Sequence, residues 1–104
     1  MIWMQLVIAG LLEIVWAYTL KLSHGFTRPA YSLMTLVAMG ASFWLLARAM
    51  RALPLGTAYA VWTGIGSAGA FLAGIILLGE AASPIRILAA GMIVGGIVLM
   101  KLGS

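Results

Sequence analysis

The sequence carries little charge and contains no cysteine. Only 8% of its 104 residues are charged, and the acidic ones are two glutamates, Glu13 and Glu80. The absence of cysteine excludes disulfides, thiolate metal sites and cysteine nucleophiles. The sequence also shows no nucleophile–base pair, no phosphate-binding loop and no His, Asp and Glu set with metal-ligand spacing. These absences argue against an enzyme and against a bound metal or other cofactor.

Apolar residues dominate instead. They make up 64% of the chain, and the mean hydropathy is +1.17. A soluble domain of this size buries too little of its surface to hide so much apolar area, so lipid is the expected solvent. The net charge of +4 comes from cations scattered singly at the ends of apolar runs. We expect them to meet lipid headgroups rather than nucleic acid.

Charged residues divide the sequence into four long apolar segments. We expect helices at about residues 2–22, 29–50, 54–79 and 84–102, within a single transmembrane domain over residues 1–104. The prolines Pro29, Pro54 and Pro84 each fall where one of the last three helices would begin, a position that proline suits. The segments lack the two-residue alternation of barrel strands and are about twice too long for them. The fold class predicted is therefore an all-α membrane protein with four transmembrane helices.

The Lys and Arg residues do not favour one orientation in the membrane. With four spans, three of them lie on each side: Lys21, Arg28 and Arg86 on one, and Arg48, Arg51 and Lys101 on the other. The positive-inside rule then has no side to select. Either the first helix alone sets the orientation, or the chain inserts both ways up and forms an antiparallel homodimer.

Glu13 stands in the middle of the first apolar segment. A carboxylate at that depth costs several kcal/mol unless it faces protein, water or a cation, so it is a functional-site hypothesis by default. Residues three or four apart share a helical face. The face that contains Glu13 also contains small residues, among them Gly10, and the indole of Trp16. This pattern is more typical of a cavity lining than of a packed seam.

Further polar and aromatic residues occur in the second and third helices. Ser42 is placed to donate a hydrogen bond to a carboxylate, or to its own i−4 carbonyl as is common in membrane helices. Tyr59 and Trp62 form either an aromatic wall of a site or part of an interfacial aromatic belt. Gly64 and Gly66 follow them and predict a flexible or kinked point in the helix.

The fourth helix contains neither an acid nor an aromatic residue. Its small residues include the pair Ala89 and Gly96, seven positions apart, and a Gly91-x-x-x-Gly95 spacing. Small residues let membrane helices approach closely. We therefore expect the fourth helix to be a surface for association.

Glu80 closes the third apolar segment and is expected at the membrane interface. It lies near Arg86 in the sequence, and a solvated or loosely paired carboxylate is the simplest interpretation. His24, in the turn before Gly25, is interpreted as a polar loop residue.

One buried glutamate beside aromatic rings can serve two cations in turn. Desolvation disfavours the ionised form of a buried carboxyl group, which can therefore hold a proton or exchange it for a cation. Aromatic faces attract organic cations through their quadrupole. Because the two occupants exclude each other, proton entry and cation exit become coupled. Four helices are too few to enclose a path and alternate its access, so at least a dimer is expected, and inverted copies would suit it.

Four features of the sequence can be compared with known families: its length, its four spans, Glu13 and the stretch Pro54-Leu-Gly-Thr-Ala-Tyr-Ala-Val-Trp-Thr-Gly-Ile-Gly66. Together they resemble the small multidrug resistance family of proton-coupled cation exporters. The resemblance implies a dual-topology, antiparallel homodimer in the bacterial inner membrane, with both copies of Glu13 at one central site. The family's fourth-helix contact uses two glycines seven apart. The matching residues here are Ala89 and Gly96.

Within that family, the stretch Glu13-Ile-Val-Trp16 resembles the guanidinium-exporter subtype, which implies guanidinium/H⁺ antiport. By position, Glu13 would bind guanidinium or protons, Ser42 and Trp62 would orient its carboxylate, Trp16 and Tyr59 would line the site, and Gly10 would give close backbone access. Two alternatives stay open. One is a polyspecific exporter of quaternary ammonium ions and drugs, and the other is a non-transporting assembly or regulatory subunit.

Overall fold

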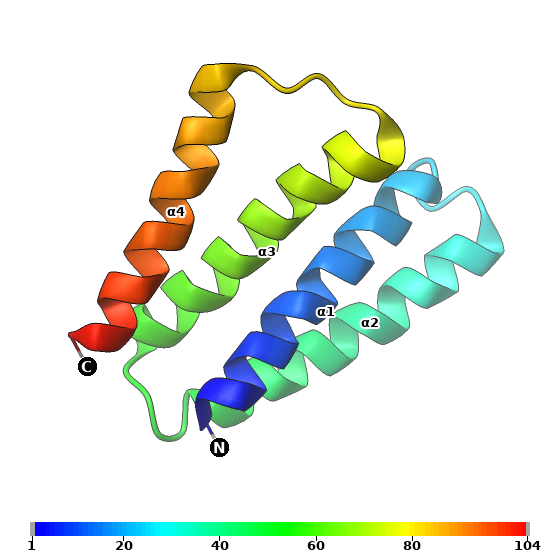
Figure 1. The fold of residues 1–104 in the computed structure, drawn as a ribbon. Helices are drawn as coiled ribbons and strands as arrows, with labels where there is room; N and C mark the ends of the chain where they lie inside the picture. The colour runs from blue at the N-terminus through cyan, green and yellow to red at the C-terminus, as the bar shows by residue number, and fades with distance from the viewer. Residues whose placement is uncertain (1, 104) are drawn as a thin grey trace.

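The computed structural model describes residues 2–103, and within them it has four helices. They are α1 (Ile2–Leu22), α2 (Pro29–Ala49), α3 (Leu55–Leu78) and α4 (Pro84–Leu102), joined by short connections (Figure 1). All four are long and apolar enough to cross a membrane. The predicted all-helical membrane fold with four spans is thereby confirmed.

The prolines stand at the helix starts. Pro29 and Pro84 are the first residues of α2 and α4, and Pro54 is the N-cap of α3. A first-turn proline loses nothing there, because its missing N–H would have had no partner within the helix. At α4, the Ser83 side chain accepts a hydrogen bond from the Arg86 backbone N–H at 3.3 Å, the usual arrangement of a serine N-cap.

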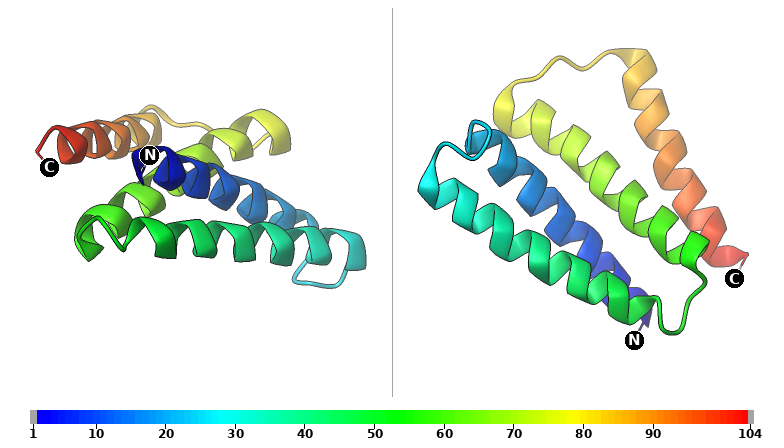
Figure 2. Two further views of the ribbon diagram at one scale, coloured as in Figure 1. Left: turned by 90° about the horizontal axis from the view of Figure 1, so that it is seen from below. Right: turned by 180° about the vertical axis from the view of Figure 1, so that it is seen from behind.

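Successive helices run in opposite directions and form a thin slab whose principal extents are 41 × 34 × 17 Å. α1 packs against both α2 and α3, and α4 lies along α3 at one edge (Figures 1 and 2). Where the first three helices meet, they bury a small core, which consists of Leu6, Ala9, Leu46, Ala49, Ala58, Val61 and Trp62. On α1 this core contains Leu6 and Ala9, in the half of the helix that precedes Glu13.

α4 is the most exposed of the helices. No residue within Pro84–Leu102 is buried, and large apolar side chains such as Ile85, Met92 and Leu99 are exposed. Methyl groups built on Gly91 or Gly95 would meet nothing within 4 Å. The surface of α4 is therefore open to lipid or to another helix.

A polar contact ties α1 to α2. The Thr35 hydroxyl donates to Thr19 Oγ1 at 2.7 Å, and the Thr19 hydroxyl lies 3.2 Å from the Trp16 carbonyl oxygen, to which it donates. Both threonines are buried. Hydrogen bonds of this kind between membrane helices contribute about 0.6 kcal/mol on average.

Candidate cation-binding site

The Glu13 side chain lies against the backbone of α3 at Gly66. Gly66 is buried, and a methyl group built on it would overlap Oε1 and Cδ of Glu13 and lie 2.6 Å from its Cγ. A glycine at this position is thus what lets the carboxylate pack there. Glu13 Oε1 is itself buried and has no hydrogen-bond partner among the described residues. A buried acceptor without a donor is costly, so this oxygen is suited to a proton or to an N–H group of a ligand.

Ser42 and Trp62 form a buried hydrogen-bonded chain that ends on α1. Trp62 Nε1 donates to Ser42 Oγ at 2.9 Å, and the Ser42 hydroxyl donates to the Ala9 carbonyl oxygen at 2.7 Å. Its acceptor is neither the Glu13 carboxylate nor its own i−4 carbonyl, the two partners considered from the sequence. Since Ala9 lies one helical turn before Glu13, the chain holds the α1 backbone beneath the carboxylate.

Four aromatic rings from three helices form a continuous cluster. The Trp16 and Phe43 rings lie 6.2 Å apart, Phe43 and Trp62 5.7 Å, and Tyr59 and Trp62 5.7 Å, all at steep or tilted angles. Trp62 is buried, whereas 53% of Tyr59 is exposed. The predicted aromatic residues are thus brought together, with Tyr59 at the open end.

Phe43 connects Trp16 to Trp62 and was missed in the sequence. It follows Ser42 directly in the sequence, but it is an apolar residue in an apolar segment, so no sequence pattern distinguished it. A second feature missed is a set of three buried polar atoms that, like Glu13 Oε1, have no partner among the described residues. These atoms are Gln5 Oε1, Trp16 Nε1 and Thr63 Oγ1. A polar residue inside an apolar run was the available signal for Gln5.

The other glycines of the predicted site lie at contacts between helices. A methyl group on Gly10 would lie 2.6 Å from Ile65 Cγ2, and one on Gly64 would lie 2.8 Å from Ile97 Cδ1. The absence of a side chain at Gly10 therefore lets α3 pack closely against α1, and its absence at Gly64 lets α4 pack closely against α3. α3 is one continuous helix from Leu55 to Leu78 through both Gly64 and Gly66.

The predicted association residues of α4 are accessible. Ala89 is exposed, and a methyl group on Gly96 would meet nothing within 4 Å. They lie on a stripe beside α3, where each lines a shallow depression between the two helices.

Four membrane-length helices and a mid-span carboxyl group whose Oε1 is buried define a small multi-pass membrane protein with an intramembrane ionisable site. A family model described as Small Multidrug Resistance protein matches residues 1–93. Among curated proteins, a "Guanidinium exporter" of Yersinia pseudotuberculosis serotype I (strain IP32953) is 62% identical over 104 residues, which is 100% of both chains. Another "Guanidinium exporter", from Citrobacter freundii, is 59% identical and covers 100% of this chain and 99% of its own. The chain belongs to the small multidrug resistance family, as the resemblance of its motifs predicted, and family membership makes it a membrane transporter.

Proposed function

We propose that this protein exports guanidinium from the bacterial cell across the inner membrane in exchange for protons. The observation that carries the proposal is the buried Oε1 of Glu13, at the middle of a membrane-length helix, which has no hydrogen-bond partner in the part of the chain that the structure describes. Relatives that are 57–62% identical and named guanidinium exporters support it. Guanidinium presents its N–H groups in a planar fork that matches the two oxygens of a carboxylate. A proton satisfies the same oxygen, so the two ions compete for Glu13.

The surroundings of Glu13 suit this competition. The aromatic cluster offers ring faces to a cation, and cation–π attraction is stronger where water is excluded. Trp16 Nε1 is a further buried group that has no hydrogen-bond partner within residues 2–103. Ser42 and Trp62 position the carboxylate through the Ala9 carbonyl of α1. Tyr59, half exposed, lines the opening of the site.

The working unit proposed is an antiparallel homodimer in which two copies of Glu13 share one central site. The exposed face of α4 with Ala89 and Gly96 and the equal Lys and Arg counts on the two sides support it. In such a dimer the two copies exchange conformations and open the site to one side and then the other. Gly66 forms the floor beneath the carboxylate, and we place the gating movement of α3 at Gly64 and Gly66.

The test is transport by the purified protein in liposomes. An imposed pH gradient is expected to drive guanidinium uptake, and the isosteric variant Glu13→Gln is expected to abolish it. Absence of flux in the unmodified protein, or flux that survives Glu13→Gln, contradicts the proposal. Transport by the purified chain alone also excludes a purely structural or regulatory subunit.

The same assay separates guanidinium export from polyspecific drug export. Negligible guanidinium flux together with strong competition by large aromatic ammonium ions would identify the protein as a drug exporter of the same architecture. Guanidinium flux that such ions inhibit weakly supports the narrower function.

A further inference from the structure

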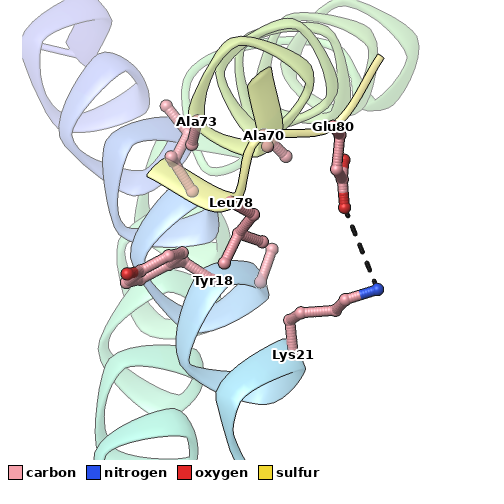
Figure 3. Close-up of a pocket in the computed structure, with 9 residues that line it drawn as sticks. Tyr18, Lys21, Ala70, Ala73, Leu78 and Glu80 are labelled. Atoms are coloured by element: carbon pink, nitrogen blue, oxygen red, sulfur yellow. Dashed lines mark ion pairs between the residues drawn. The ribbon is translucent and has the colours of Figure 1, made fainter. Parts of the chain in front are cut away.

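The second acidic residue, Glu80, lies at the rim of a separate pocket. The pocket measures about 160 Å³ and is lined by nine residues of α1, α3 and the segment after α3. Lys21 and Glu80 face each other across its mouth, and Tyr18 and Ala70 lie among the residues behind them (Figure 3). Glu13 and Glu80 are the two acidic residues of the sequence.

The end of α3 holds the Glu80 carboxylate in place. Gly79 has a left-handed backbone with a φ of 68°, which turns the chain so that the Glu80 backbone N–H donates to the Gly74 carbonyl oxygen at 3.0 Å. The carboxylate then packs on Gly74. A methyl group there would overlap Glu80 Oε1 and lie 3.0 Å from its Cδ. Glycine at both positions therefore allows the carboxylate to pack against the end of α3 at the mouth of the pocket.

The partner of this carboxylate is weakly held. Lys21 Nζ lies 3.8 Å from Glu80 Oε2, and the two side chains are 67% and 47% exposed. Exposed ion pairs of this kind contribute little, so the carboxylate is readily available to another cation. A planar guanidinium binds both carboxylate oxygens at once, whereas the lysine ammonium acts as a compact point charge. Arg86 does not compete for Glu80, because its guanidinium lies over the Phe71 ring, 5.3 Å from the centroid.

The pocket extends from Glu80 along α1 and α3 and ends before Glu13 and Gly66, neither of which lines it. Its lining extends along α1 from Lys21 to Ile14, the residue that follows Glu13, which is about 10 Å along the helix axis. On α3 the lining includes Ala70, one turn beyond the Gly66 backbone that contacts Glu13. A cation at Glu80 is thus about two helical turns from the level of Glu13, on the same pair of helices.

We propose that Glu80 is a peripheral binding site for guanidinium-type cations and that the Lys21 ammonium competes with them for its carboxylate. The cation displaces the lysine ammonium from Glu80 and is thereby concentrated at the mouth of a pocket that lies about two helical turns from the level of Glu13. The role of Glu80 in flux rests on the proposed guanidinium transport, whereas the binding of the cation to Glu80 does not.

Transport kinetics at low ionic strength test the role in flux. Glu80→Gln is expected to raise the KM for guanidinium about two- to fivefold with kcat unchanged, the range set by exposed ion pairs. Lys21→Gln is expected to lower the KM by a similar factor, and both effects should shrink in high salt. Arg28→Gln is the matched control, because it removes one exposed positive charge from the same side of the membrane. It is expected to leave the KM unchanged.

Opposite signs of the two KM changes distinguish a binding site from a simple structural pair. If Glu80→Gln and Lys21→Gln change the KM in the same direction, or if Arg28→Gln reproduces Lys21→Gln, the proposal is overturned.

Binding is tested independently of transport in the Glu13→Gln variant. Added guanidinium chloride is expected to shift the NMR signal of the Glu80 side-chain carboxyl in a saturable way, more strongly than tetramethylammonium chloride, which has no N–H groups. No saturable shift overturns the proposal. If the shift occurs while the unmodified protein carries no guanidinium, the proposed function fails and the site at Glu80 stands.

Discussion

Replacing Gly66 by alanine tests whether the packing of Glu13 on α3 matters for transport. The new methyl group would occupy the space of the Glu13 carboxyl group. Since the methyl belongs to a rigid helix backbone and Glu13 is a flexible side chain, the carboxylate is the group that must move. The substitution leaves every atom of Glu13 in the chain and changes only where its carboxylate lies.

The expected loss can be estimated from this displacement. The methyl group would lie 2.6 Å from Glu13 Cγ, so the side chain must rotate away from its present position. An off-rotamer side chain costs about 0.5–1.5 kcal/mol, and misplacing a reacting group by about 1 Å costs up to about 10²-fold in rate. We therefore expect Gly66→Ala to lower kcat/KM for guanidinium by about ten- to a hundredfold.

The assay is guanidinium uptake into proteoliposomes, with thermal unfolding in detergent measured on the same preparations. Gly40→Ala is the matched control, because Gly40 is in a helix and a methyl group there meets nothing within 4 Å. That control should transport normally and gain up to about 1 kcal/mol in stability from the better helix former. Wild-type transport by Gly66→Ala would refute the placement of Glu13 on α3. A loss in Gly40→Ala equal to that in Gly66→Ala would show that the effect is unspecific.

Three further predictions concern the hydrogen bonds and the proton. Ser42→Ala should lower the free energy of unfolding by about 1–3 kcal/mol, because it leaves the Trp62 N–H buried without a partner and removes the second hydrogen bond to the Ala9 carbonyl oxygen. Denaturant titration in micelles measures this change, and a loss under about 0.5 kcal/mol, the size expected for an exposed surface change, would contradict it. Thr35→Val should lower the free energy of unfolding by about 0.6 kcal/mol in the same titration, since it removes a hydrogen bond between α1 and α2. It should leave transport unchanged, because this bond lies away from Glu13. Impaired transport in a stable variant would show that the bond also affects the site. The affinity for guanidinium, measured by calorimetry, should fall by up to about tenfold per pH unit as the pH is lowered, because each proton bound to Glu13 excludes one cation. An affinity independent of pH would exclude direct competition between the proton and guanidinium.

The spans and the central acid were readable from the order of residues. The four apolar segments and the prolines at their starts predicted α1 to α4 because length and polarity decide membrane insertion locally, before any helix meets another. Glu13 stood out for the same reason, since an acid in an apolar run is costly wherever the helices pack.

The hydrogen-bond partners were not readable in this way. The sequence placed Ser42 and Trp62 near the carboxylate, but it did not predict the Ala9 carbonyl as the acceptor of Ser42. It predicted a flexible or kinked point at Gly64 and Gly66, but it did not predict that these glycines make room for Ile97 and Glu13 respectively. Periodicity identifies which face of a helix a residue occupies, but not the height or rotation of the neighbouring helix.

The sequence by itself determined that this is a four-span membrane protein with one acid at mid-depth and, through its motifs, its family. Both depend on residue order alone, because insertion into lipid responds to the composition of each segment. The tertiary structure decided that Glu13 lies on Gly66, that Phe43 joins the two tryptophans, and that Glu80 lies beside Lys21 at the mouth of a pocket. These contacts depend on how helices cross, and a shift of a few ångströms between helices would change every partner without changing a single span.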